Sequence, residues 1–114
     1  MEIYQERRDH VLIVAPVGRV DTTTAPHLEQ AVGAALDAGE RRIVVDLEGV
    51  SYISSVGLRL LLVAAKRMRE RQGLLVLCTL GDAVRQVLDL AGFLPLFTIE
   101  QTRDLAVARC ASGA

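Results

Sequence analysis

The sequence predicts a mixed α/β fold, in which an N-terminal antiparallel hairpin is followed by parallel strands packed with about four helices. Three observations favour this class. Two strand candidates near the N-terminus, of which only the second is strongly apolar, are joined by the polar link Arg8-Asp9-His10, which suits a tight hairpin. Segments 42–47 and 74–79 carry apolar runs typical of strands covered on both faces. Between the strands, apolar residues recur at helical spacing, and no linker or repeat divides the 114 residues. We therefore expect a single domain, 1–114.

The hairpin and the first helix occupy the first third of the chain. We expect strands at Ile3–Arg7 and at His10–Val17, the second of which is ended by Gly18. Asp21–Thr24 then supplies side chains that cap a helix, and Pro26 is tolerated in the first helical turn, where amide donors lack partners. The apolar face of this helix consists of Leu28, Val32, Ala35 and Leu36.

A buried strand and a long helix follow. Arg42–Leu47 is the strand, Glu48-Gly49 turns the chain, and Val50–Ile53 leads to a helix opened by Ser54 and Ser55. Basic residues near the end of this helix suit the negative pole of its dipole. Its apolar positions are Leu58, Leu61, Leu62, Ala65 and Met68.

The last third alternates strand and helix twice more. Leu74–Thr79 is a buried strand, Gly81-Asp82 starts a short helix, and Leu96–Ile99 is a short strand. A final helix runs from about Thr102 to Arg109. The short helix has apolar positions at Val84, Val87, Leu88 and Ala91. The predicted order is β-β-α-β-α-β-α-β-α, with right-handed crossovers.

Composition excludes several classes of function. A net charge of -1 argues against direct nucleic-acid binding, which normally requires a basic excess. The longest apolar run, Val11–Val17, is too short for membrane insertion. The charged N-terminus does not resemble a secretory signal, and Cys78 and Cys110 lack a CxxC spacing, so we expect reduced, buried thiols and a cytoplasmic location.

Enzymatic sites are poorly supported by the residues. His10 and His27 are the only histidines, and both are interpreted as surface residues, so no metal site is expected. The stretch Ile53-Ser54-Ser55-Val56-Gly57 lacks the first glycine of a nucleophile elbow. Asp46 at a strand end could form an acid pair with Glu48 or Asp82, but an aspartate that accepts backbone hydrogen bonds in the following turn is the better interpretation.

The loop that ends at Ser54-Ser55 is chemically suited to a switch. One of the two serines is expected to cap the helix, by accepting a hydrogen bond from an amide that lacks a helical partner. A helix N-terminus also favours an added phosphate, because its amides point outward and its dipole is positive there. Arg59 lies one turn beyond Ser55 and could pair with such a phosphate.

Three segments resemble the STAS domain of anti-sigma factor antagonists. Residues 46–58, DLEGVSYISSVGL, are similar to the family signature D-L-S-x-V-x-[FY]-[IM]-D-S-[ST]-G-L, with Ser54 in place of Asp and Val56 in place of Ser or Thr. Gly18-Arg19-Val20-Asp21-Thr22 resembles the strand exit G-x-[LV]-D, and residues 83–93 resemble a later helix of the family. The resemblance covers nearly the whole chain and implies a STAS-type mixed sheet.

The resemblance also implies a function. Stand-alone members bind an anti-sigma factor that is a serine kinase, and phosphorylation by that kinase releases them until a PP2C-like phosphatase resets the system. The phosphorylated serine corresponds to Ser55, with Ser54 as a less favoured acceptor. No catalytic residue, metal or cofactor is implied, and a monomer or weak dimer is expected. The predicted docking face comprises Asp21, Thr22, Ser54, Ser55, Val56, Gly57 and Arg59, with Leu58 turned inward.

Two alternatives remain open at this point. The chain could be a STAS subunit of a lipid-transport or stress-signalling complex, with the same loop as a constitutive contact. A small nucleotide-binding protein or hydrolase is the weakest interpretation, because no base lies near Ser55 in the sequence and no Gly-rich phosphate loop is present.

Overall fold

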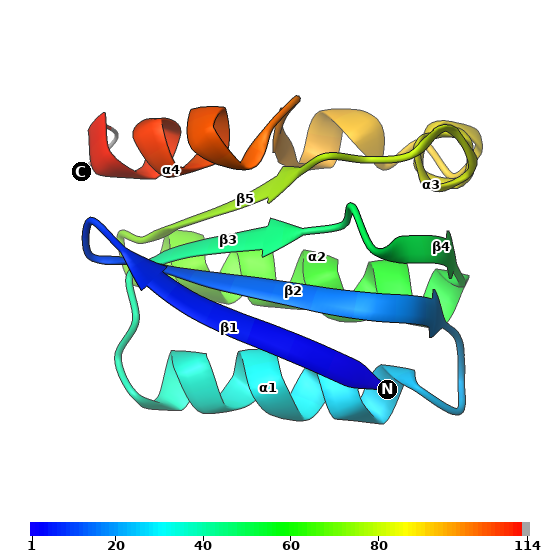
Figure 1. The fold of residues 1–114 in the computed structure, drawn as a ribbon, viewed down its shortest axis with the longest axis horizontal. Helices are drawn as coiled ribbons and strands as arrows, with labels where there is room; N and C mark the ends of the chain where they lie inside the picture. Colours follow the sequence, from blue (N-terminus) through cyan, green and yellow to red (C-terminus); the bar gives the residue numbers. More distant parts are fainter. Residues whose placement is uncertain (113–114) are drawn as a thin grey trace.

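The computed structural model describes residues 1–112 and has the expected mixed α/β architecture (Figure 1). The strands are β1 (Glu2–Arg8), β2 (Val11–Val20), β3 (Arg42–Asp46), β4 (Val50–Ile53), β5 (Leu74–Cys78) and β6 (Thr98–Glu100). The helices are α1 (Ala25–Asp37), α2 (Ser55–Glu70), α3 (Asp82–Leu90) and α4 (Arg103–Ser112), with one 3-10 turn, η1 (Leu94–Leu96). Among these described residues, no helix is long and apolar enough to cross a membrane.

The sheet has the order β1-β2-β3-β5-β6, and β4 pairs with β2 beside this path. The β1–β2 pair is antiparallel and every other pair is parallel, which confirms the predicted hairpin followed by parallel strands. The predicted order was incomplete in one respect, because it did not count Val50–Ile53 as a strand. This segment is the additional strand β4. It can pair because β2 is long enough to contact β3 along its first half and β4 along its second half.

The hairpin turn is tighter, and its second strand longer, than predicted. Asp9 and His10 both have positive φ values, 54° and 64°, so two residues complete the turn. The prediction that Gly18 ends the strand was wrong, because the strand continues to Val20. Gly18 instead has a φ of 112° at a shift in the β2–β4 register, a conformation that glycine adopts without a steric penalty.

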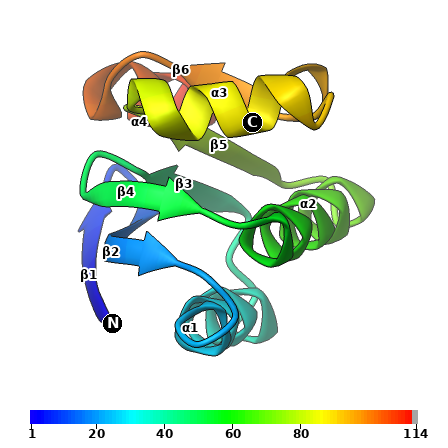
Figure 2. The same ribbon diagram turned by 90° about the vertical axis from the view of Figure 1, so that its right-hand side faces the viewer.

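Helices cover both faces of the sheet. Figures 1 and 2 show α1 and α2 side by side on one face, with α4 on the other. Successive residues of β2 face opposite sides: Leu12 and Val14 join the core under α1 and α2, while Val11 and Ile13 join the core under α4. This arrangement explains the continuous apolar runs of the central strands, which are buried on both faces.

The C-terminal third differs from the prediction in its details. The predicted strand Leu96–Ile99 was shifted, because Pro95 supports the 3-10 turn η1 and pairing begins only at Thr98. Three predicted core positions are also less buried than their spacing indicated, since Leu62 and Val87 are half-buried and Ala91 lies exposed beyond the end of α3. The final helix is confirmed, with bounds Arg103–Ser112.

Candidate functional site

The β2–β4 pairing brings two distant loops to the same edge of the sheet. The Ser54 amide donates a hydrogen bond to the Val20 carbonyl at 2.8 Å, directly after the last residues of both strands have paired. Because the two strands are parallel, Asp21 and Thr22 leave the sheet at the same edge as Ser54 and Ser55. Two of the three segments that resemble the family, residues 18–22 and 46–58, thus meet at one surface.

Ser54 is the residue that caps α2. Its backbone is extended, with φ -85° and ψ 170°, and its Oγ accepts a hydrogen bond from the Gly57 amide at 3.3 Å. The Ser54 carbonyl accepts from the Leu58 amide at 3.0 Å. This geometry decides between the two serines that the sequence left equivalent as caps, and it engages the Ser54 hydroxyl in holding the helix start.

Ser55 is the first residue of α2, and its side chain is exposed. Within residues 1–112, no hydrogen bond involves the Ser55 hydroxyl. The first turn of α2 contains no acidic residue, and Arg59, one turn further on, is also exposed. The hydroxyl therefore lies in a setting that tolerates added negative charge, where amide donors and the positive end of the helix dipole are both present.

Two residues of the signature lie beneath this surface. Leu58 is 1% exposed and packs into the larger core, as predicted. Gly57 is also buried, and a Cβ at this position would lie only 2.7 Å from Val20 Cγ1 and 2.8 Å from Ile53 Cγ1. The glycine thus lets α2 approach β2 and β4 closely. Gly57 was predicted to belong to the docking face, but it is buried and acts by allowing the close packing of α2 beneath that face.

Asp21 organises the turn between β2 and α1. Its Oδ1 accepts hydrogen bonds from the amides of Thr23 and Thr24, at 3.0 and 3.1 Å. These bonds, with the Thr24 amide first, lower the pKa of the Asp21 carboxyl. The prediction that these side chains cap α1 itself was wrong, because the cap residue Thr24 makes no side-chain cap bond and its hydroxyl donates to the Arg19 carbonyl instead. Thr22, at the tip of the turn, is exposed.

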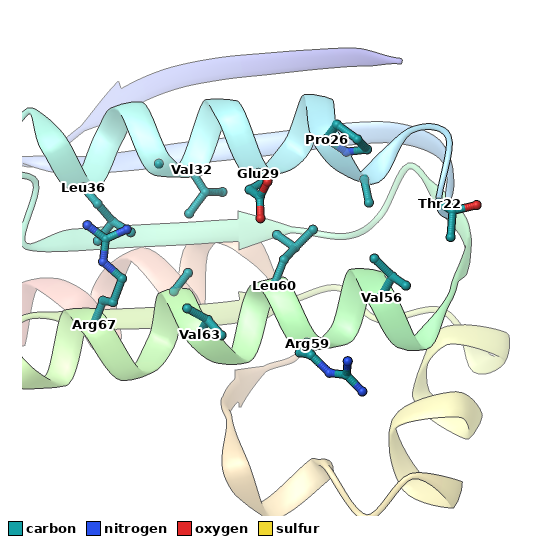
Figure 3. Close-up of a pocket in the computed structure, with 13 residues that line it drawn as sticks. Thr22, Pro26, Glu29, Val32, Leu36, Val56, Arg59, Leu60, Val63 and Arg67 are labelled. Atoms are coloured by element: carbon teal, nitrogen blue, oxygen red, sulfur yellow. The ribbon is translucent and has the colours of Figure 1, made fainter.

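A groove of about 380 Å³ extends from this surface along the helices α1 and α2. Figure 3 shows Pro26, Val32 and Leu36 on one side and Val56, Leu60 and Val63 on the other. Thr22, Val56 and Arg59 belong both to the predicted docking face and to the lining of the groove. The groove was not predicted from the sequence, although Leu60 and Val63 lie outside the apolar positions assigned to the core of α2.

A second feature that sequence reasoning missed lies on β2 and β4. The Arg19 guanidinium stacks over the Tyr52 ring, with 4.5 Å between its central carbon and the ring centroid. The two residues are register partners in the β2–β4 pair, and Arg19 also lies 4.0 Å from Asp21 Oδ2. Because this register depends on the unpredicted pairing of β4, the sequence carried no direct signal for the contact.

The remaining candidate chemical groups are not brought together. Asp46 is 2% exposed, and its Oδ1 accepts from the Glu48 amide at 3.0 Å, as the preferred interpretation predicted. Its partner is Arg103, whose Nε lies 2.8 Å from Asp46 Oδ2, so the alternative of an acid pair was wrong. Both histidines are exposed, and within residues 1–112 no group of three or more potential ligands could hold a metal ion.

The thiols are buried in the smaller core, as expected. Cys78 and Cys110 are unpaired, and burial in apolar surroundings raises the pKa of each to about 11. Neither has the lowered pKa of a reactive thiolate.

Comparison with known proteins agrees with this arrangement. The model of the STAS domain matches residues 2–106. A Bordetella bronchiseptica protein named as the anti-sigma factor antagonist BtrV is 43% identical over 108 residues, which cover 95% of this chain and 93% of that protein. The crystal structure of an anti-sigma factor antagonist from Mycobacterium paratuberculosis superposes with a TM-score of 0.87 at 31% identity, covering 96% of this chain and 92% of that one.

More distant structures share the fold. The Bacillus protein SpoIIAA superposes in its unphosphorylated form with a TM-score of 0.79 at 20% identity, and in its phosphorylated form with 0.72 at 19%. The coverage is 95% of both chains in the first case, and 95% of this chain and 98% of the other in the second. Taken with the family model and the 43% identity to BtrV, these findings establish that the chain belongs to the STAS domain family and is a homologue of its anti-sigma factor antagonists.

Proposed function

We propose that this chain is a partner-switching antagonist, which binds an anti-sigma factor with serine kinase activity and is released when that kinase phosphorylates Ser55. The observation that carries the proposal is the exposed Ser55 hydroxyl at the start of α2, beside a cap residue, Ser54, that is already engaged. The role is one of binding and not of catalysis. It would be exercised in the cytoplasm, where sigma factors act.

The acceptor assignment follows from the different positions of the two serines. A kinase must reach the hydroxyl, and Ser55 is exposed whereas Ser54 is partly buried with its Oγ facing the Gly57 amide. Phosphorylation of Ser54 would cost the cap bond, while phosphorylation of Ser55 removes no hydrogen bond that the described residues make. Support of a general kind comes from SpoIIAA, a protein of the same fold that is known in a phosphorylated form.

Release would be electrostatic and steric. A phosphate adds about two negative charges at pH 7 and three acceptor oxygens. At the start of α2 it is compatible with the fold, because the amides and dipole favour it and Arg59 lies one turn away. In a closed interface, the same charge loses its hydration without a partner, and a loss of about 3 kcal/mol weakens binding by roughly two orders of magnitude.

The test uses the serine kinase of anti-sigma type encoded nearest to the gene of this chain, here called the cognate kinase. Isothermal titration should show binding of the unmodified chain. Incubation with the kinase and ATP should place one phosphate on Ser55, located by tandem mass spectrometry, and the purified phosphoprotein should bind at least 50-fold more weakly. A PP2C-type phosphatase encoded in the same neighbourhood should restore binding.

Matched variants make the test specific. Ser55→Ala should bind the kinase and resist phosphorylation, whereas Ser54→Ala should still be phosphorylated at residue 55. A chain that binds the kinase equally well with and without the phosphate would favour a constitutive contact, and a chain that neither binds nor is modified would contradict the proposal.

A further inference from the structure

The groove between α1 and α2 has the form of a docking site for a helix. The two helices lie side by side and run in the same direction, with Pro26 opposite Val56 and Leu36 opposite Arg67 (Figure 3). Between these pairs the groove extends for about 16 Å, or three helical turns, at 1.5 Å per residue. An elongated, open groove of this length fits one face of a short helix.

One wall of the groove is an apolar stripe that the fold leaves uncovered. Val56, Leu60 and Val63 occupy positions i, i+4 and i+7 of α2, which lie on one side of a helix. Val56 is 42% exposed and Val63 is 52% exposed, although both are large apolar residues. The stripe continues from Ser55, so a partner that contacts the serine can also reach it.

Small residues keep the groove open. Ala25, Gly33 and Ala64 contribute to its lining, and a Cβ added at Gly33 would meet no atom within 4 Å. The glycine is therefore not required by packing inside this chain, even though glycine weakens a helix interior relative to alanine. The free space above it allows the backbone or a large side chain of a partner to approach α1 closely.

The two walls carry opposite charge. The helix α1 has two acidic residues, Glu29 and Asp37, and neither Lys nor Arg. The helix α2 has a single acidic residue, Glu70, and four basic ones: Arg59, Lys66, Arg67 and Arg69. Glu29 lines the groove from the α1 side, while Arg59 and Arg67 line it from the α2 side. Arg67 Nη2 lies 3.7 Å from Asp37 Oδ1 on the facing helix, so these two charges already partner each other at one end of the groove. A ligand that complements both walls therefore brings negative charge to Arg59 and positive charge to Glu29.

We infer that this groove binds an amphipathic helix of the partner kinase, with an apolar stripe in the groove, acidic residues along the α2 edge and basic residues along the α1 edge. The inference rests on the proposed function and extends it by naming the second part of the interface and the partner element that fills it. An amphiphile with a single anionic head would match only the α2 wall, and therefore fits the charge pattern less well than a helix with charge of both signs.

The experiment compares groove variants with a matched control in titrations against the cognate kinase. Val63→Asp places a charge on the apolar stripe, and Gly33→Leu fills the open space with a residue of higher helix propensity. The control is Leu105→Asp, because Leu105 is 50% exposed, close to the 52% of Val63, but lies on α4, on the opposite face of the sheet. Circular dichroism and thermal unfolding of each variant verify that the fold is kept.

We expect both groove variants to weaken binding at least tenfold and the control to change it by less than twofold. Glu29→Lys should also weaken binding, because it reverses the charge of the α1 wall. If the groove variants bind as tightly as the unmodified chain while phosphorylation of Ser55 still releases the kinase, the inference is wrong and the proposed function stands. If the unmodified chain neither binds the kinase nor is phosphorylated, both are wrong.

A photo-crosslinking residue at position 63 identifies the occupant. Cross-links to a helical segment of the kinase with an apolar stripe and charged edges support the inference. Cross-links to a second copy of this chain, to a loop of the kinase, or the finding by native mass spectrometry of a bound amphiphile that the kinase does not displace would each overturn it.

Discussion

Arg103 Nε donates a hydrogen bond of 2.8 Å to Asp46 Oδ2 and thereby ties the start of α4 to the end of β3, 57 residues earlier. A second nitrogen of the same guanidinium lies 2.7 Å from Glu6 Oε1 on β1. The Asp46 side chain is 2% exposed while that of Arg103 is 36% exposed, and the hydrogen bond to Asp46 raises the pKa of Arg103. One charged cluster thus joins two strands and the helix that covers them.

Removal of the Asp46 carboxylate should be costly. Asp46→Ala leaves Arg103 without its buried partner and the Glu48 amide without an acceptor, so we expect a loss of about 2 to 3 kcal/mol in the free energy of unfolding, measured by urea denaturation. Glu100→Gln is the control, because it weakens the more exposed pair with Arg109 and should cost less than about 1 kcal/mol. Equal losses of unfolding free energy in the two variants would show that the Asp46–Arg103 pair contributes no more to stability than the more exposed Glu100–Arg109 pair.

The two serines should separate stability from modification. Ser54→Ala removes the acceptor of the Gly57 amide at the start of α2 and should lower the free energy of unfolding by about 1 kcal/mol. Ser55→Ala changes an exposed side chain and should alter stability by less than about 0.5 kcal/mol. Thermal and urea unfolding of both variants measure the difference, and a larger loss for Ser55→Ala would show that the cap has been assigned to the wrong residue.

Two helical glycines should respond in opposite ways to the same substitution. Gly57→Ala drives a methyl group to within 2.7 Å of Val20 and should destabilise the protein by about 1 to 3 kcal/mol. Gly33→Ala meets no atom within 4 Å and should stabilise the protein by about 0.5 to 1 kcal/mol through the higher helix propensity of alanine. Urea unfolding of the two variants should give changes of opposite sign, and a shared sign would contradict the packing described for one of them.

Alkaline pH should weaken the fold through its two buried thiols. Burial raises the pKa of Cys78 and Cys110 from 9.0 to about 11, so above pH 9 the unfolded chain loses protons that the folded chain keeps. The free energy of unfolding should therefore fall as pH rises from about 9 towards about 11. Unfolding titrations at several pH values measure this slope. Cys110→Ala should reduce it, and an unchanged slope in that variant would contradict the assignment.

Acid should destabilise the protein through Asp21, in the turn that precedes α1. The hydrogen bonds from the Thr24 and Thr23 amides hold the pKa of Asp21 below its ordinary value, so the unfolded chain takes up a proton first as pH falls. The stabilisation is complete above an ordinary aspartate pKa of about 4 and is lost as pH falls through the lower, folded value. In Asp21→Asn, the dependence of stability on pH below about 4 should be shallower, and an identical dependence would rule out Asp21 as a contributor.

Much of the fold was predictable because the information was local. The polar link Arg8-Asp9-His10 predicted the hairpin, and the apolar run that includes Ile43 and Val45 predicted a strand covered on both faces. Errors arose where a segment depends on a remote partner. Val50–Ile53 becomes a strand only because β2 extends past Gly18, and the segment before β6 is displaced by a turn around Pro95.

In the candidate site too, local features were predictable from the sequence, whereas features that depend on remote contacts were not. The motif at residues 46–58 was sufficient to place the helix start at Ser54-Ser55 and to indicate the family. The sequence left both serines as possible caps, because a cap is defined by which hydroxyl faces a free amide, and only the approach of α2 to β2 and β4 settles that for Ser54.

By itself, the sequence determined the order of the elements other than β4, the two-sided burial of the central strands and the chemistry available at residue 55, because backbone propensity and side-chain period act over a few neighbouring residues. Only the tertiary structure decided that Asp46 pairs with Arg103, that Gly57 lies in a contact too tight for a methyl group, and that α1 and α2 leave an apolar groove with oppositely charged walls. Each of these depends on distances between residues far apart in the chain, and such distances are set by how whole helices and strands pack against one another.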